Sequence, residues 1–264
     1  MITMFEDKIG NIPAIHAAPQ GRMDTPLPVV FFYHGYRNSK ETSAFFAYLL
    51  AMNGMRAILP EANLHGARFN GNDQERLGLF WDLLKQNIDE LELYRDFYQT
   101  RGLIAEGRIG VAGTSMGGFV TLGCAARYDW VTAAASYMGS GYYLDAARTI
   151  FPPLGRYDSQ TRQEHDRRLS GLRPYQIEGD RLERLANVPL FLWHGGRDEI
   201  VPYSESVRLQ ADLLDRDLAG NLEFVCDPLG THRVSADGAA RGIAFLKKIL
   251  LSEKYDLVLG KDIL

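Results

Sequence analysis

The chain has 264 residues, of which 46% are hydrophobic and 23% charged, and its formal charge is −4, as in an ordinary globular protein with one large core. So mild a charge gives no electrostatic support for binding nucleic acid or an anionic membrane, and the two distant cysteines do not form a metal-binding pair. The N-terminal sequence lacks the order of a signal peptide and no apolar run approaches the ~18 residues of a transmembrane helix, so we expect a cytoplasmic protein.

Residues 1–20 predict two short strands around a turn at Gly10 and Asn11, at the antiparallel edge of a larger sheet. Apolar strands then alternate with helical segments along the chain. The later strands are expected at Val29–Tyr33, Met55–Leu59, Ile109–Ala112, Val131–Met138, Val188–Trp193 and Leu222–Cys226. The helices are expected at residues 38–54, 73–99 (one long helix or two in succession), 119–126, 204–214 and 234–251. This alternation predicts the α/β class, with one domain over residues 1–264 and a mostly parallel, doubly wound sheet.

A Gly-x-Ser-x-Gly sequence at residues 113–117 connects an apolar strand to an apolar helix. In this position the pattern predicts a nucleophile elbow, a tight turn that exposes the hydroxyl of Ser115. Glycine is required on both sides because a Cβ at Gly113 or Gly117 would collide with the neighbouring backbone. The alternative is a glycine-rich turn that only links a strand to a helix, so the interpretation of Ser115 as a nucleophile depends on partners further along the chain.

Residues 142–186 interrupt the alternation of strands and helices. This segment contains eight arginines, seven acidic residues and no lysine. Because it leaves the strand next to the elbow strand at its carboxyl end, we expect a helical cap over the active site, with Tyr142, Phe151 and Leu154 lining a substrate pocket. The alternative is a solvated helical excursion.

Two loops after later strands offer a base and an acid for Ser115, because a serine hydroxyl needs a base and the base needs an orienting acid. His232 follows Gly230-Thr231 just before a helix, and Asp198 lies in the glycine-containing loop after Trp193. Asp227 is the second choice for the acid. The order Ser115, Asp198, His232 is the one expected of this fold.

The backbone N–H groups of Tyr36 and Met116 are the candidate oxyanion-hole donors. Tyr36 lies in the loop after the strand Val29–Tyr33, and Met116 begins the helix after the elbow. His34 and His65 both precede glycine in loops, and we expect structural roles for them. No two histidines sit at metal-ligand spacing with a carboxylate, so no metal is expected.

These residues resemble the α/β-hydrolase superfamily. The elbow is similar to that of its prolyl-oligopeptidase-like and dienelactone-hydrolase-like branches, and the whole chain resembles the small bacterial carboxylesterases of the YjfP type. The similar segments are His-Gly-Tyr at 34–36, Phe-Trp at 80–81, Met-Gly-Ser-Gly-Tyr at 138–142, Phe-Pro-Pro-Leu at 151–154, Leu-Trp-His-Gly at 192–195 and Val-Pro at 201–202. The elbow carries serine and not cysteine, which argues against a dienelactone hydrolase.

The resemblance implies a cofactor-free serine esterase that acts on small-molecule esters with short acyl chains, with Ser115 as nucleophile, His232 as base and Asp198 as orienting acid. A thioesterase or acyltransferase would use the same three residues. An alternative of another class is a non-catalytic hydrolase fold that binds a ligand or a partner. The sequence does not specify the oligomeric state, the physiological substrate or the acyl length.

Overall fold

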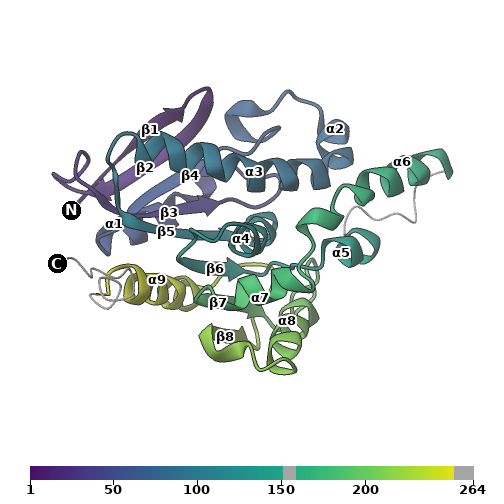
Figure 1. The fold of residues 1–264 in the computed structure, drawn as a ribbon. Helices are drawn as coiled ribbons and strands as arrows, with labels where there is room; N and C mark the ends of the chain where they lie inside the picture. The colour runs from purple at the N-terminus through teal and green to yellow at the C-terminus, as the bar shows by residue number, and fades with distance from the viewer. Residues whose placement is uncertain (151–158, 253–264) are drawn as a thin grey trace.

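The computed structural model describes residues 1–150 and 159–252, with side chains described at 1–150 and 162–252. Eight strands form one sheet in the order β1-β2-β4-β3-β5-β6-β7-β8 (Figure 1). The strands are β1 (Ile2–Ile9), β2 (Ile12–Pro19), β3 (Leu27–Tyr33), β4 (Arg56–Pro60), β5 (Ile104–Thr114), β6 (Ala133–Tyr137), β7 (Leu190–Gly195) and β8 (Leu222–Asp227). Pairing is antiparallel between β1 and β2 and between β2 and β4, and parallel from β4 to β8. The predicted α/β class, with a mostly parallel sheet and an antiparallel edge, is confirmed.

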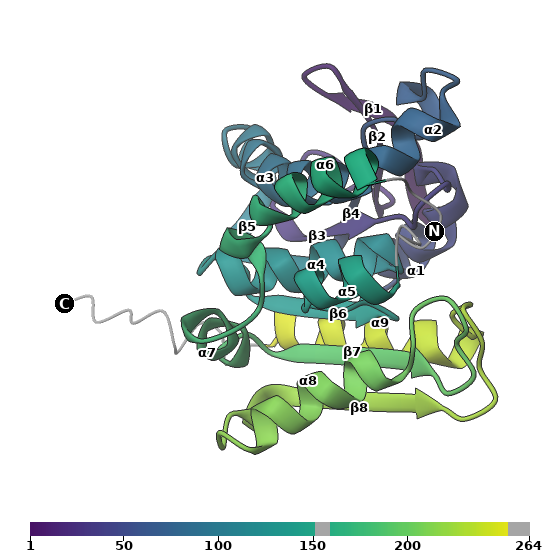
Figure 2. The same cartoon turned by 90° about the vertical axis from the view of Figure 1, so that its right-hand side faces the viewer.

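Helices cover both faces of the sheet, which is why every residue of β3, β4, β6 and β7 is buried. The helices are α1 (Ala44–Met52), α2 (Asp73–Gly78), α3 (Phe80–Gln99), α4 (Met116–Arg127), α5 (Tyr143–Thr149), α6 (Ser159–Ser170), α7 (Asp180–Ala186), α8 (Ser204–Leu214) and α9 (Ala236–Leu250). One apolar core joins one face of the sheet to α3, α4, α5, α7 and α8, and a second joins the other face to α1 and α9. Figure 2 shows α4 and α5 on one side of β6 and α9 on the other.

The structure refines several predicted boundaries. The segment 73–99 forms two successive helices, α2 and α3. Strand β5 begins five residues before the predicted Ile109, and its pairing with β3 shifts register between Leu27 and Val29. The backbone has positive φ at Glu106 and Gly107, so the strand makes an irregular step there that an apolar pattern does not reveal.

The helical segment between β6 and β7 lies on the same face as α3 and α4. Helix α6 contacts α3, and α7 packs against α4. The guanidinium of Arg168 donates to the carbonyl of Gly78 at 3.0 Å, which ties α6 to the end of α2. Figure 1 shows α6 reaching outward from the rest of the molecule. Within the part of the chain that the structure describes, no helix is both long enough and apolar enough to span a bilayer.

Candidate active site

Ser115 occupies a strained turn between β5 and α4. Its φ is +54° and its ψ is −120°, a conformation that is costly for a residue with a Cβ. A hydrogen bond from its N–H to the carbonyl of Tyr137 (2.9 Å) holds the turn against β6. An added Cβ at Gly117 would lie 2.0 Å from the carbonyl oxygen of Tyr33, and one at Gly113 would lie 2.5 Å from that of Gly117. The predicted steric need for glycine on both sides of Ser115 is therefore met in the structure.

The imidazole of His232 lies between Ser115 and Asp198. Its Nε2 is 2.8 Å from Oγ of Ser115, and its Nδ1 is 2.8 Å and 3.0 Å from the two carboxylate oxygens of Asp198. The three side chains come from the loops after β5, β7 and β8, which meet at one edge because these strands run parallel. The structure thus brings together the three residues that the sequence predicts as nucleophile, base and acid.

Asp198 is held as an ionised acceptor. Burial alone would raise its pKa, but hydrogen bonds from the His194 and His232 side chains and from the N–H of Ile200 hold that pKa well below its ordinary value. The N–H of Val201 adds a further donor at 3.0 Å. With its carboxylate fixed and charged, Asp198 accepts the Nδ1–H of His232, which leaves the lone pair of Nε2 directed at Ser115.

Backbone hydrogen bonds join the two loops that carry Asp198 and His232. The N–H of Gly196 donates to the backbone carbonyl of Asp227 (2.7 Å), and the N–H of Arg197 donates to the backbone carbonyl of Gly230 (2.8 Å). The carboxylate of Asp227, the second choice for the acid, accepts the N–H groups of Leu229 and Gly230. Asp227 therefore shapes the loop that carries the histidine, whereas Asp198 contacts the imidazole itself.

The candidate oxyanion donors flank Ser115. Met116 is the first residue of α4, so its N–H belongs to the helical turn whose donors have no intrahelical acceptor. The loop that contains Tyr36 lies against the nucleophile, since an added Cβ at Gly35 would be 3.5 Å from Cβ of Ser115. Tyr36 and Met116 both line the pocket at Ser115.

A mostly apolar pocket of about 280 Å³ opens beside Ser115. It is lined by Tyr36, Phe80, Trp81, Ser115, Met116, Phe119, Ile150, Ile200, Val201 and His232. The segment between β6 and β7 contributes Ile150, directly after α5. Phe80 and Trp81, at the start of α3, are pocket residues that the sequence analysis did not identify, although their adjacent aromatic rings were a signal.

The expectation that Tyr142 lines the substrate pocket is corrected by the structure. Tyr142 is buried and is not among the described residues that line this pocket. Its hydroxyl donates to a carboxylate oxygen of Asp212 on α8 at 2.5 Å, and the guanidinium of Arg208 lies over its ring. These contacts draw the side chain toward α8. Phe151 and Leu154, the other two predicted pocket residues, lie outside the described residues.

A second histidine–carboxylate pair lies under the loop of residues 34–36. Nε2 of His34 is 3.2 Å from Oε1 of Glu61, and both side chains are almost fully buried. Nδ1 of His34 donates to the carbonyl of Gly35 at 2.9 Å. Burial alone would raise the pKa of Glu61, but His34 and the N–H groups of Ala67 and Lys40 lower it to about 2. The structure gives His34 the structural place that the sequence predicts.

Glu61 is a residue that sequence reasoning missed. It follows directly after the end of β4, at the same sheet edge as the loop after the adjacent strand β3. An acidic residue in that position, beside a strand that ends in His-Gly, was the available signal. His65, which packs near His34, donates from Nδ1 to the carbonyl of Asn63 at 2.8 Å, and burial lowers its pKa to about 4.

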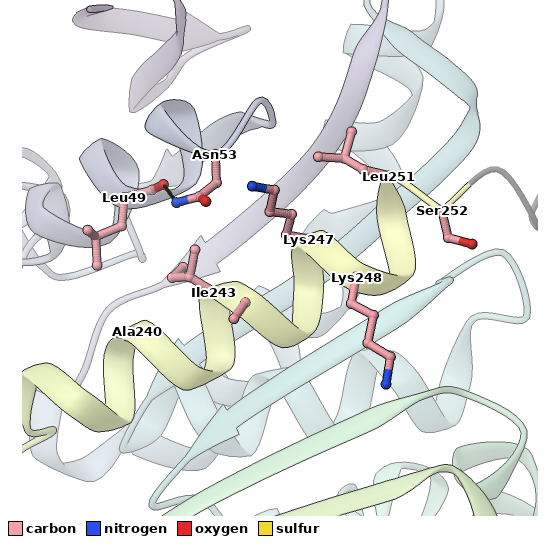
Figure 3. Close-up of a pocket in the computed structure, with 9 residues that line it drawn as sticks. Leu49, Asn53, Ala240, Ile243, Lys247, Lys248, Leu251 and Ser252 are labelled. Atoms are coloured by element: carbon pink, nitrogen blue, oxygen red, sulfur yellow. Dashed lines mark hydrogen bonds between the residues drawn. The ribbon is translucent and has the colours of Figure 1, made fainter.

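A separate and larger hollow, of about 560 Å³, lies between α1 and α9 (Figure 3). Its lining combines apolar side chains such as Leu49 and Ile243 with Lys247 and Lys248. None of its lining residues comes from the loops that hold Ser115, Asp198 and His232. In the part of the chain that the structure describes, no cluster of three or more His, Cys, Asp or Glu side chains is arranged to hold a metal ion.

Comparison with known proteins assigns the class. A profile of the prolyl oligopeptidase family matches residues 43–251, most of the chain. The chain therefore belongs to the prolyl oligopeptidase family, and its sheet and helices form an α/β-hydrolase fold.

Full-length relatives refine this assignment. The chain is 36% identical to esterase YjfP of Escherichia coli (strain K12) over 250 residues, which cover 95% of this chain and 100% of the relative. It is 31% identical to the YitV protein of Bacillus subtilis (strain 168) over 255 residues, again 95% and 100% of the two chains. The crystal structure of TT1662 from Thermus thermophilus shares the fold, with a TM-score of 0.73, 20% identity and coverage of 96% and 100%. Together, the family and these relatives support a hydrolase.

Proposed function

We propose that the protein is a serine carboxylesterase that hydrolyses short-chain acyl esters through an acyl-enzyme intermediate. The observation that carries the proposal is the continuous hydrogen-bonded line from Oγ of Ser115 through the imidazole of His232 to the carboxylate of Asp198. The esterase name of the relative YjfP, which matches nearly the whole chain, supports the same reaction class.

In the proposed reaction, Oγ of Ser115 attacks the ester carbonyl carbon while Nε2 of His232 accepts the hydroxyl proton. The negative charge that develops on the carbonyl oxygen is stabilised by the N–H groups of Tyr36 and Met116. The carbon–oxygen bond to the alcohol then breaks, and the leaving oxygen takes the proton from His232. Water, deprotonated by the same imidazole, attacks the acyl-enzyme and releases the acid and free Ser115.

Asp198 does not exchange a proton in this scheme. Its carboxylate orients the imidazole and stabilises the imidazolium that forms in each step. The low pKa of Asp198 keeps its carboxylate charged at neutral pH, so the carboxylate can stabilise the imidazolium there.

The apolar pocket supports a short acyl chain. Its volume of about 280 Å³ lies just below the usual range of ligand pockets, about 300–1,000 Å³. The rings of Phe80, Trp81 and Phe119 line it. A panel of p-nitrophenyl esters tests this part of the proposal: kcat/KM should be higher for the C4 ester than for the C12 ester, and the reverse order would overturn it.

The nucleophile is tested with Ser115→Ala. We expect the turnover of p-nitrophenyl acetate to fall by at least about 10⁴-fold and labelling by a fluorophosphonate probe to disappear. Ser204→Ala, at an exposed serine on α8, is the matched control and should keep wild-type turnover and labelling. Retained hydrolysis in Ser115→Ala would refute the proposal.

A further inference from the structure

Another hollow, of about 530 Å³, touches His232 from the other face of the sheet. It is distinct from the hollow between α1 and α9 and is called the second hollow below. It is lined by Asn38, Thr42, Phe45, Phe46, Thr114, Met138, His232, Arg233, Val234, Ser235, Ala236 and Ala239. Phe46, Met138 and Ala239 belong to the core shared with α1 and α9, whereas the walls of the apolar pocket belong to the core of α3 and α4. The reactive imidazole therefore separates two hollows of different origin.

The two hollows differ in which reacting groups they touch. The apolar pocket contains Tyr36 and Met116, whose N–H groups are the proposed oxyanion donors, so the carbonyl and its acyl chain belong on that side. The second hollow shares only His232 with it. In ester cleavage the leaving oxygen must receive its proton from His232, so the alcohol part of the ester extends on the side of the imidazole away from the acyl chain.

The chemistry of the second hollow is polar and positively charged. Asn38, Thr42 and Ser235 supply side-chain hydrogen-bonding groups, and none of its described lining residues is a carboxylate. Arg233 is exposed and takes part in none of the ion pairs found among the described residues.

The acidic residues next in sequence to the lining residues Thr42 and Ala236 are already paired with other cations. Glu41 pairs with Lys40, and Asp237 accepts from Arg241 at 2.7 Å. The guanidinium of Arg233 thus places a positive charge beside His232, although the chain as a whole has a formal charge of −4. The first turn of α9, which begins at Ala236 on the wall of the hollow, adds a favourable dipole for an anion.

We propose that this hollow binds the alcohol part of the substrate, and that Arg233 selects esters whose alcohol or phenol carries a carboxylate. This inference rests on the proposed esterase function and names the substrate class of the same site. The covalent step is unchanged: the bond from Oγ of Ser115 to the acyl carbon forms, the bond to the leaving oxygen breaks, and the proton passes through His232. The carboxylate takes no part in bond making and pairs with the guanidinium of Arg233.

A matched pair of substrates tests the proposal. 4-Acetoxybenzoate and 4-acetoxybenzamide have the same acetyl group and leaving groups of similar size, and they differ in the charge that would reach Arg233. The measured quantity is the ratio of kcat/KM for the two esters within each variant, so differences in overall activity cancel. We expect Arg233→Gln to lower this ratio by about fivefold, in the range of a partly exposed ion pair, and Arg233→Lys to restore part of it.

Arg216→Gln is the control for the change in net charge, because Arg216 is exposed after α8 and lines none of the three hollows described above. It should keep the wild-type ratio. Rising salt should lower the ratio of the wild-type protein, which tests the same pairing without a substitution. An unchanged ratio in Arg233→Gln, with p-nitrophenyl acetate still hydrolysed, would overturn this inference alone. Absence of all ester hydrolysis in the wild-type protein would overturn the esterase proposal and this inference with it.

Discussion

The histidine–carboxylate pair beside Ser115 and the pair under the loop of residues 34–36 lie at the same edge of the sheet, and they differ in access to solvent. In the pair of His232 and Asp198, 23% of the histidine side chain is exposed, and its free nitrogen contacts Ser115. In the pair of His34 and Glu61, the histidine side chain is 1% exposed and its other nitrogen donates to backbone. A histidine and a carboxylate thus contact a serine hydroxyl in one place and hold a loop in the other. Contact with a hydroxyl, rather than pairing with a carboxylate, distinguishes the proposed catalytic histidine from the structural one.

Several hydrogen-bond donors contact the carboxylate of Glu61. Its carboxylate accepts the N–H of Lys40 (3.0 Å) and of Ala67 (3.2 Å), and the ammonium of Lys40 lies 3.4 Å away. An added Cβ at Gly66 would lie 2.1 Å from this carboxylate. The buried pair therefore anchors the chain before and after the loop that carries Tyr36.

The largest effect should come from the pair of His232 and Asp198. Asp198→Asn should lower kcat for p-nitrophenyl acetate by about 10³- to 10⁴-fold, because an amide favours the wrong tautomer of His232 and does not stabilise its charged form. Asp227→Asn is the matched control, since the carboxylate of Asp227 accepts two backbone N–H groups in the same region, and its activity should fall by less than about tenfold. A larger loss in Asp227→Asn than in Asp198→Asn would reverse the assignment of the acid.

The buried pair should show its importance in stability. Glu61→Gln should lower the free energy of unfolding in urea by about 3 kcal/mol, because it leaves the buried ammonium of Lys40 without its buried counter-charge. Glu41→Gln removes one of the two exposed carboxylates, Glu6 and Glu41, that also pair with Lys40, and it should cost less than about 1 kcal/mol. Equal stability losses in the two variants would contradict the distinction between buried and exposed partners.

Stability should also depend on pH. Burial lowers the pKa of His65 to about 4, and burial followed by the charge of Arg56 lowers that of His16 to about 4, from an ordinary value of 6.5. Between pH 6.5 and 4 the unfolded chain therefore binds more protons than the folded chain, and each histidine should cost on the order of 1–3 kcal/mol as the pH falls through this window.

Glu61 should not contribute until more acidic conditions. Its folded pKa of about 2 lies below the ordinary 4.5, so the stability that it provides is retained above pH 4.5 and lost as the pH falls toward 2. Urea midpoints measured at pH 7, 5 and 4 test the histidine window. A midpoint that does not change between pH 7 and 4 would show that these imidazoles are not held neutral by burial.

The sequence predicted the elements that repeat a pattern and the residues whose chemistry requires a particular place in the fold. Strand and helix alternation indicated the sheet, and the order of Ser115, Asp198 and His232 indicated three side chains that the structure places in hydrogen-bond contact. The boundary of β5 was missed because positive φ at Glu106 leaves no apolar signal.

The pocket was less predictable than the three reactive side chains, because it depends on which way large side chains point. Tyr142 has a partner in Asp212, which lies 70 residues further along the chain, and local sequence gives no measure of such a contact. The contact between Glu61 and His34 depends on the adjacency of β3 and β4, so its position after a strand was only a weak signal. The proposed role of Arg233 was equally hard to predict, because it depends on the hollow that Arg233 lines beside His232.

Strand β8 differs from the other parallel strands because it lies at the open edge of the sheet and none of its six residues is buried. The loop that it leads into holds His232, so the proposed general base follows directly after an incompletely buried edge strand. Fraying at such a margin requires less free energy than melting of the interior. On warming, the enzyme should therefore switch off reversibly while most of its secondary structure persists, so that the upper limit of its working temperature is set by one strand rather than by the fold as a whole.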